Sequence, residues 1–117
     1  MVRFSESKNI YIYSNTVDMR MGLNKIQVLV ALNFSKIDRA HSVFIFCSKR
    51  RDTIKMYYED DYGSWLLQER LFDTRFKWPE GLESGRSISK QELNGLCKGL
   101  QVIESAPKKK RGNKDLI

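Results

Sequence analysis

The chain has 117 residues, of which 41% are hydrophobic and 11% aromatic, enough for one compact domain with a core and too few for two. Lysine and arginine number 21 against 14 acidic residues, which gives a formal net charge of +7. A positive balance is compatible with a polyanionic partner such as DNA, although a basic surface can also be merely solvated.

The C-terminal end carries much of the excess charge. Because residues 107–117 have no apolar face to bury, we expect a disordered basic tail there, behind a single domain of residues 1–106. This tail would be either a DNA-binding arm or a solubilising end. Its charged residues are Lys108, Lys109, Lys110, Arg111, Lys114 and Asp115.

The cysteines and the hydropathy exclude several classes of protein. Cys47 and Cys97 lie far apart, with no C-x-x-C pair and no clustered histidine, so we expect no zinc site. The chain does not open with a signal peptide, and no apolar stretch approaches the roughly 20 residues of a membrane helix. We therefore expect a cytoplasmic protein with reduced thiols, no metal, no cofactor and no membrane contact.

The N-terminal part predicts a strand followed by a helix. Residues 9–13 are β-branched and aromatic, which favours a strand, and Ser14 and Asn15 mark its end. Residues 18–32 predict an amphipathic helix, capped by Thr16 or Asp18. Its apolar stripe consists of Met19, Leu23, Ile26 and Val30.

The middle of the chain predicts a hairpin. Residues 42–47 are apolar on both alternating faces, as in an interior strand that is covered on each side. A charged turn over residues 48–52 separates this strand from an alternating run over residues 53–58. The five-residue spacing fits a hairpin loop.

Two further segments follow the hairpin. Residues 64–71 fit a strand, although Trp65, Gln68 and Phe72 also suit helical spacing, so a helix is the alternative. Residues 74–78 predict the last strand, because aromatic and basic residues alternate there before Pro79.

A helix is predicted over residues 89–100. Ser89 and Glu92 form a capping box ahead of apolar residues at helical spacing. Together the elements predict an α+β fold, with an antiparallel sheet of about four or five strands and two helices packed on it.

Carboxylates are the candidates for metal-dependent chemistry, because two metals held by acidic residues can stabilise a phosphoryl transfer. The candidates are Asp18, Asp52, Glu59, Asp60 and Asp61. However, residues 59–61 fall in a predicted turn, and capping explains Asp18. His41 is the only histidine, and neither cysteine has a context that lowers a thiol pKa. We therefore expect no catalytic residue and no metal ligand.

Basic and aromatic residues form the constellation most suited to binding. Cations on one sheet face could track phosphates, whereas simple alternation of a buried and a solvated face would give the same pattern. The candidates for nucleic-acid or partner contact are Lys49, Arg50, Arg51, Lys55, Arg75 and Lys77. The candidates for an aromatic partner surface are Tyr57, Tyr58 and Trp65.

Several segments, taken in order, resemble one family. They are the run Val17-Asp18-Met19-Arg20-Met21-Gly22-Leu23, the strand with Phe44 and Phe46 that continues into residues 49–55, residues 63–71, and Arg75-Phe76-Lys77-Trp78-Pro79. This pattern is similar to the TnpB-type accessory protein that bacterial three-gene insertion sequences encode beside a separate transposase. That family is unrelated to the RNA-guided nuclease that shares its label. The resemblance covers about residues 9–100.

The resemblance implies a product that supports transposition without a chemical activity of its own. The sequence departs from the family at residues 57–59, where members often carry a tryptophan, and its lysine-rich tail is its own. The interpretation is a non-enzymatic accessory factor that binds DNA, the transposase of the same element, or both. The alternatives are a protein adaptor that makes no DNA contact and a metal-dependent nuclease.

Overall fold

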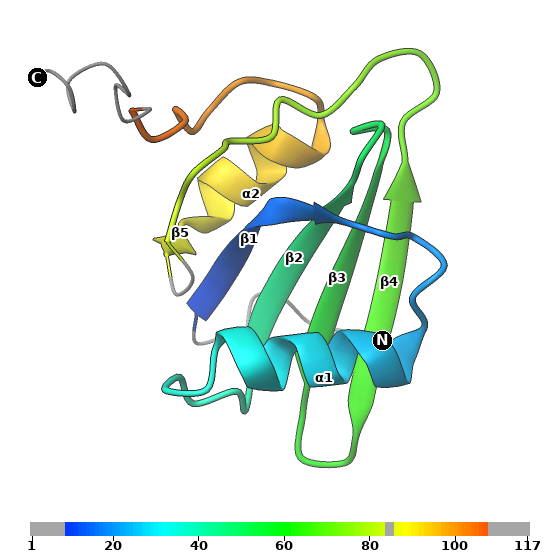
Figure 1. The fold of residues 1–117 in the computed structure, drawn as a ribbon, viewed down its shortest axis with the longest axis vertical. Coiled ribbons are helices and arrows are strands. Elements are labelled where there is room, and N and C mark those ends of the chain that lie inside the picture. Colours follow the sequence, from blue (N-terminus) through cyan, green and yellow to red (C-terminus); the bar gives the residue numbers. More distant parts are fainter. Residues whose placement is uncertain (1–8, 84–85, 108–117) are drawn as a thin grey trace, which may run out of the picture.

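The computed structural model describes residues 9–83 and 86–107, which form a five-stranded sheet with one helix on each face (Figure 1). The elements are β1 (Asn9–Val17), α1 (Leu23–Asn33), β2 (Ser42–Ser48), β3 (Thr53–Glu59), β4 (Ser64–Arg70), β5 (Ser87–Ile88) and α2 (Lys90–Cys97). The predicted α+β class is confirmed. The predicted tail, from residue 108 onward, lies outside the described residues.

The sheet has the strand order β4-β3-β2-β1-β5 and is mostly antiparallel. The exception is the central pair, because β1 and β2 run parallel, with Val17 opposite Ser48. Parallel neighbours need a crossover connection, and α1 supplies it. The prediction of an antiparallel sheet is therefore wrong for this one pair. As a result, β1 and β2 end side by side.

Each face of the sheet has its own core. The α1-side core consists of Val17, Ile26, Val30, Phe34, Phe44, Phe46 and Tyr57. The α2-side core consists of Ile10, Ile12, Val43, Ile45, Cys47, Ile54, Met56, Tyr58, Phe76, Trp78, Ile88, Leu93, Leu96 and Ile103. All seven residues of β2 are buried, which confirms an interior strand that is covered on both sides.

β1 does not end at Ser14 and Asn15. It continues to Val17, with a shift of register between Ile12 and Thr16 that marks a bulge. The Ser14 hydroxyl donates to the Pro79 carbonyl at 3.0 Å and accepts from the Leu82 amide at 3.1 Å. Ser14, which resembles a strand end in the sequence, therefore anchors the loop of residues 79–82 to β1.

α1 begins at Leu23, five residues after the predicted start. Gly22 occupies the N-cap position without a side-chain hydrogen bond, so the proposed caps Thr16 and Asp18 are wrong. Thr16 pairs with Cys47 in the sheet instead, and Asp18 binds Arg20 in the connecting turn. Two of the four residues of the predicted apolar stripe, Ile26 and Val30, are fully buried against the sheet.

Residues 74–78 are not a strand. The segment lies across the face of the sheet, where the Phe76 amide donates to the Arg51 carbonyl at 2.6 Å and Trp78 Nε1 donates to the Tyr13 carbonyl at 2.9 Å. Phe76 and Trp78 enter the α2-side core, while Arg75 and Lys77, which alternate with them, are exposed. An extended segment packed on a sheet shows the same alternation as a strand within it. The fifth strand is β5, paired with β1.

The remaining elements agree with the predictions made from the sequence. Residues 64–70 form β4 rather than a helix. The capping box of α2 is present, because Ser89 Oγ accepts from the Glu92 amide at 3.0 Å and Glu92 Oε1 accepts from the Ser89 amide at 2.8 Å. α2 ends at Cys97, three residues before the predicted end.

Candidate nucleic-acid interface

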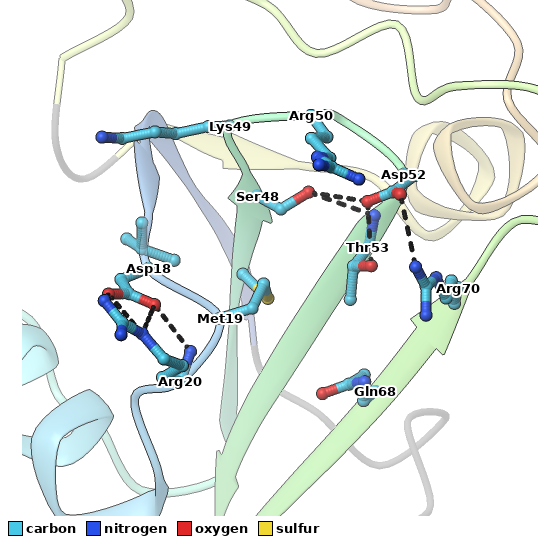
Figure 2. A pocket seen from close by; sticks show the side chains of 11 residues that line it. Asp18, Met19, Arg20, Ser48, Lys49, Arg50, Asp52, Thr53, Gln68 and Arg70 are labelled. Carbon is cyan, nitrogen blue, oxygen red and sulfur yellow. Dashed lines mark hydrogen bonds and ion pairs between the residues drawn. The ribbon is translucent and has the colours of Figure 1, made fainter.

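A basic cleft lies at the end of the sheet where β1 and β2 stop (Figure 2). Its volume is about 470 Å³, and it is lined by the turn after β1, the β2–β3 turn and the last residues of β4. The charged residues that line it are Arg20, Lys49, Arg50, Arg70, Asp18 and Asp52. Four cations therefore face two carboxylates, which leaves this cleft positive.

On one side of the cleft, Asp18 and Arg20 form an exposed ion pair. Arg20 Nη2 lies 2.7 Å from Asp18 Oδ2, and the Arg20 amide donates to Asp18 Oδ1 at 2.8 Å. These hydrogen bonds hold the pKa of the Asp18 carboxyl well below its usual range. Because 91% of the Arg20 side chain stays exposed, its remaining donors are available to a phosphate.

On the other side, Asp52 organises the β2–β3 turn. Its Oδ1 accepts from the Ser48 hydroxyl at 3.2 Å and from the Thr53 hydroxyl at 3.1 Å, and Arg70 Nη2 lies 3.9 Å from its Oδ2. Partial burial acts to raise the pKa of Asp52, but these hydrogen bonds and the Arg70 charge outweigh it, so the pKa is lowered. Asp52 is thus a turn-forming carboxylate.

The predicted cations of the hairpin turn divide into two groups. Lys49 and Arg50 are exposed at the cleft. In the part of the chain that the structure describes, neither of these two side chains forms a hydrogen bond or an ion pair. Arg51 has a positive φ of 61° and an ion pair of 2.8 Å with Glu80, while its carbonyl holds the Phe76 amide. Arg51 is therefore engaged in the fold.

Arg75 and Lys77 are exposed beside this region. Arg75 Nη1 donates to the Arg50 carbonyl at 3.1 Å, so Arg75 lies next to the hairpin turn. Lys77 and Arg75 line a second, smaller hollow with Arg51 and Glu80. The structure therefore places Lys49 and Arg50 at the cleft, and Arg75 and Lys77 in the adjoining hollow.

Sequence reasoning did not place Arg20 and Arg70 in the site. Arg20 falls within the predicted helix of residues 18–32 and Arg70 within the predicted strand of residues 64–71, and neither was among the candidates for binding. The signal that could have found them is the order strand, helix, strand. That order permits a parallel pair, whose carboxyl ends meet at one end of the sheet.

Lys55 does not face solvent. Its side chain is only 7% exposed, and its Nζ donates to the Met19 carbonyl at 2.8 Å and to the Met21 carbonyl at 2.6 Å. The segment between β1 and α1 therefore covers the sheet face on which Lys55 was expected to meet phosphates. Lys55 is placed to hold that segment against β3.

Replacing Lys55 with methionine is expected to lower the free energy of unfolding by about 1–3 kcal/mol, because the carbonyls of Met19 and Met21 lose their donor. The matched control is Lys77→Met on the exposed surface, which should change stability by less than about 0.5 kcal/mol. Urea denaturation of the two variants measures the difference. Equal urea concentrations at the midpoint of unfolding for the two variants would contradict this role for Lys55.

The predicted aromatic surface does not form a single patch. Tyr57 is fully buried in the α1-side core and Tyr58 is 3% exposed in the α2-side core, because neighbouring strand residues point to opposite faces. Of these three aromatic residues, only Trp65, with 40% of its surface exposed, is accessible to a partner.

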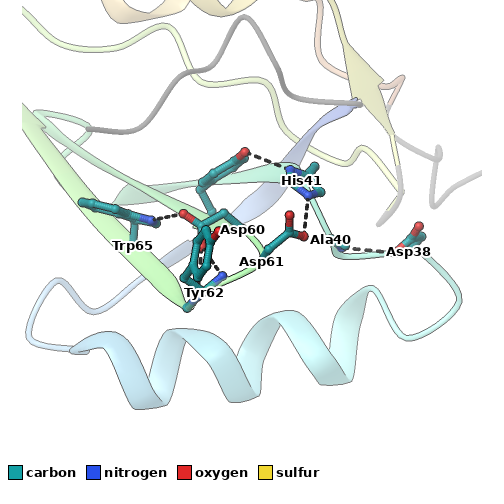
Figure 3. Close-up of polar contacts among 9 residues, drawn as sticks. Asp38, Ala40, His41, Asp60, Asp61, Tyr62 and Trp65 are labelled. Carbon is teal, nitrogen blue, oxygen red and sulfur yellow. Dashed lines mark hydrogen bonds and ion pairs between the residues drawn. The ribbon is translucent and has the colours of Figure 1, made fainter.

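The acidic residues of the β3–β4 turn have structural roles (Figure 3). Asp60 Oδ1 accepts from the Tyr62 amide at 2.8 Å and the Gly63 amide at 2.9 Å, and Asp60 Oδ2 accepts from Trp65 Nε1 at 2.9 Å. The Trp65 hydrogen bond and these two amides lower the pKa of the Asp60 carboxyl. Asp60 therefore closes the turn.

His41 lies beside the same turn. Its Nε2 is 3.0 Å from Asp61 Oδ1 and its Nδ1 is 3.3 Å from the Tyr58 hydroxyl (Figure 3). Neither thiol is activated, because burial raises the pKa of Cys47 and of Cys97 to about 12. Among residues 9–83 and 86–107, no three histidine, cysteine or acidic side chains converge in a way that could hold a metal ion.

The protein is thus a small α+β domain with a basic cleft at one end of its sheet. Residues 8–107 match the family described as IS66 Orf2 like protein, and because this match spans most of the chain, the protein belongs to that family of insertion-sequence accessory proteins. The resemblance inferred from the sequence is thereby confirmed. No helix in the described part of the chain is long and apolar enough to cross a membrane.

Two relatives come from Sinorhizobium fredii (strain NBRC 101917 / NGR234). The uncharacterized protein y4hO is 26% identical over 102 residues, which are 86% of this chain and 87% of the relative. The uncharacterized protein y4jC is 27% identical over 100 residues, which are 86% of each chain. No solved structure gives a significant match.

Proposed function

We propose that this protein is a non-enzymatic accessory factor of transposition that binds DNA through the basic cleft. The observation that carries the proposal is the convergence of Arg20, Lys49, Arg50 and Arg70, from three separate segments, on one cleft. Cations that neutralise phosphates release counterions, and this release supplies most of the affinity of non-specific DNA binding.

The cleft suits phosphates better than base edges. Its cations lie on turns and at a strand end, and neither helix projects into it (Figure 2). Contacts to phosphates position a protein on DNA without reading its sequence. The DNA binding that we propose is therefore largely independent of sequence, and any specificity for an element's ends would come from the transposase.

A second candidate function is contact with the transposase through the outer face of α1. That face carries a groove of about 360 Å³ lined by Met21, Asn24, Lys25, Val28, Leu29 and Leu32. Val28 is 57% exposed and Leu32 is 74% exposed, although the opposite side of the helix already packs on the sheet. Contiguous exposed apolar residues of this kind commonly mark a protein interface.

The experiment that tests the proposal combines two measurements on the full chain. The first is binding of the purified protein alone to labelled duplex DNA, and the second is capture of the same element's transposase with and without its terminal DNA. We expect binding to duplex DNA of any sequence, weakened by salt. Failure to bind DNA, together with capture of the transposase that does not depend on DNA, would establish the adaptor function instead.

A further inference from the structure

The outer edge of β4 is an unpaired strand edge. β4 is the last strand of the sheet, and no other strand in the described part of the chain pairs with its outer side. The opposite edge is the two-residue strand β5, whereas β4 is paired with β3 over seven residues without a bulge. A long and regular edge is a template for another strand, and proteins usually shorten, twist or charge such edges.

The hydrogen bonds at both ends of β4 show which backbone groups face outward. The Leu71 amide donates to the Asp52 carbonyl and the Asp60 amide donates to the Gly63 carbonyl, each at 2.9 Å. In an antiparallel ladder the hydrogen-bonded residues alternate, so the odd-numbered residues of β4 bond to β3. The even-numbered residues therefore direct their amide and carbonyl groups to the outer edge. These residues are Ser64, Leu66, Gln68 and Arg70.

The side chains of β4 also favour association. Its centre, Leu66-Leu67-Gln68, contains no charge, and the strand has neither proline nor lysine. Trp65 and Leu67 are each 40% exposed and point to the same face, because they are two residues apart. Tyr62 and Phe72, which flank the strand, are 98% and 100% exposed.

We propose that β4 pairs with β4 of a second copy of this chain, antiparallel and centred on Leu67, so that the two sheets become one. A two-fold axis at Leu67 matches even-numbered residues with even-numbered residues, as the outward backbone groups require. This register pairs all seven residues of β4. A centre one residue away, at Leu66 or Gln68, pairs only five.

The side chains are complementary in this register. Leu67 faces Leu67 of the second copy, Trp65 faces Glu69, and Ser64 faces Arg70, so no like charges are opposed. Tyr62 lies in the turn before β4 and Phe72 in the bend after it, so the antiparallel pairing brings Tyr62 of one copy to the same end of the interface as Phe72 of the other. These are the two most exposed aromatic side chains of the described chain. The dimer does not depend on the proposed DNA binding, although Gln68 and Arg70 of β4 also line the basic cleft.

The first test measures the mass of the full chain in solution by sedimentation at tens of micromolar. We expect a dimer for the natural sequence and at least a tenfold weaker dimer for Leu67→Lys, because two ammonium groups would then face each other at the axis. Val28→Lys on α1 is the matched control and should leave the dimer unchanged. A monomeric natural protein, or a Leu67→Lys variant that dimerises as tightly as the control, would overturn the proposal.

The second test fixes the register by cross-linking under mild oxidation. In the proposed register, Leu67→Cys places two thiols in a non-hydrogen-bonded pair with Cα atoms about 4.5 Å apart, which a disulfide can bridge. Trp65→Cys is the control, because its two copies would lie about 13 Å apart along the strands. We expect a reducible covalent dimer from Leu67→Cys only. Equal cross-linking of the two variants, or none from either, would refute pairing centred on Leu67.

Discussion

Replacing Tyr57 with alanine is expected to lower the free energy of unfolding by about 3–5 kcal/mol, the usual cost of removing a large aromatic side chain from a core. Tyr57 is fully buried, and its ring centroid lies 6.4 Å from that of Phe44. Burial raises the pKa of its phenol, so the hydroxyl stays protonated and donates to Glu59 Oε2 at 2.5 Å. Thermal or urea denaturation measures the loss.

The matched control for Tyr57 is Tyr62→Ala, because Tyr62 is 98% exposed. This variant should unfold within about 0.5 kcal/mol of the natural protein. The comparison also tests the role first expected for Tyr57, that of a partner-binding aromatic residue. A Tyr57→Ala protein of normal stability that no longer binds the transposase would contradict its placement in the α1-side core.

Replacing Lys49 and Arg50 together with serine is expected to weaken binding to duplex DNA on the order of 30-fold at 0.15 M salt, if each side chain contacts one phosphate. Both side chains are exposed at the cleft. Removing them should therefore change the free energy of unfolding by less than about 0.5 kcal/mol. The binding of labelled DNA by the two proteins at matched salt gives the ratio.

Arg51 is left unchanged in this variant because its guanidinium pairs with Glu80 and its carbonyl holds Phe76. The control is Lys36→Ser with Lys98→Ser, which removes the same charge from exposed positions that line neither basic hollow. Equal loss of affinity in the control would mean that overall charge, rather than the cleft, attracts DNA.

Local patterns in the sequence were sufficient to predict several elements. The apolar run of residues 42–47 has no polar face, which is a property of a buried strand and holds for β2. The pair Ser89 and Glu92 specifies a helix start through two hydrogen bonds that involve only neighbouring residues, and both bonds are present.

Features that depend on long-range packing were not predictable in this way. Strand direction leaves no trace in side-chain periodicity, so the parallel pairing of β1 with β2 was missed. Residues 74–78 alternate like a strand because Phe76 and Trp78 pack on the sheet. Lys55 was assigned to a solvated face because nothing in its surroundings reveals that Met19 and Met21 come to lie over it.

The same reasoning explains which site residues were found. Lys49 and Arg50 lie in a turn between adjacent strands, so a local pattern predicts their exposure. Arg20 and Arg70 reach the cleft only because β1 is parallel to β2 and β4 is antiparallel to β3. The position of Arg20 and Arg70 at the cleft therefore follows only from the topology of the sheet.

The salt dependence of DNA binding tests the central claim most directly. The logarithm of affinity is measured against the logarithm of salt concentration for the natural protein and for the variant Lys49→Ser with Arg50→Ser. Each lost phosphate contact lowers the slope by about 0.9 on duplex DNA, so two lost contacts should reduce it by about 1.8. A slope and an affinity equal to those of the natural protein would show that Lys49 and Arg50 contact no phosphate, which contradicts DNA binding by the four cations of the cleft together.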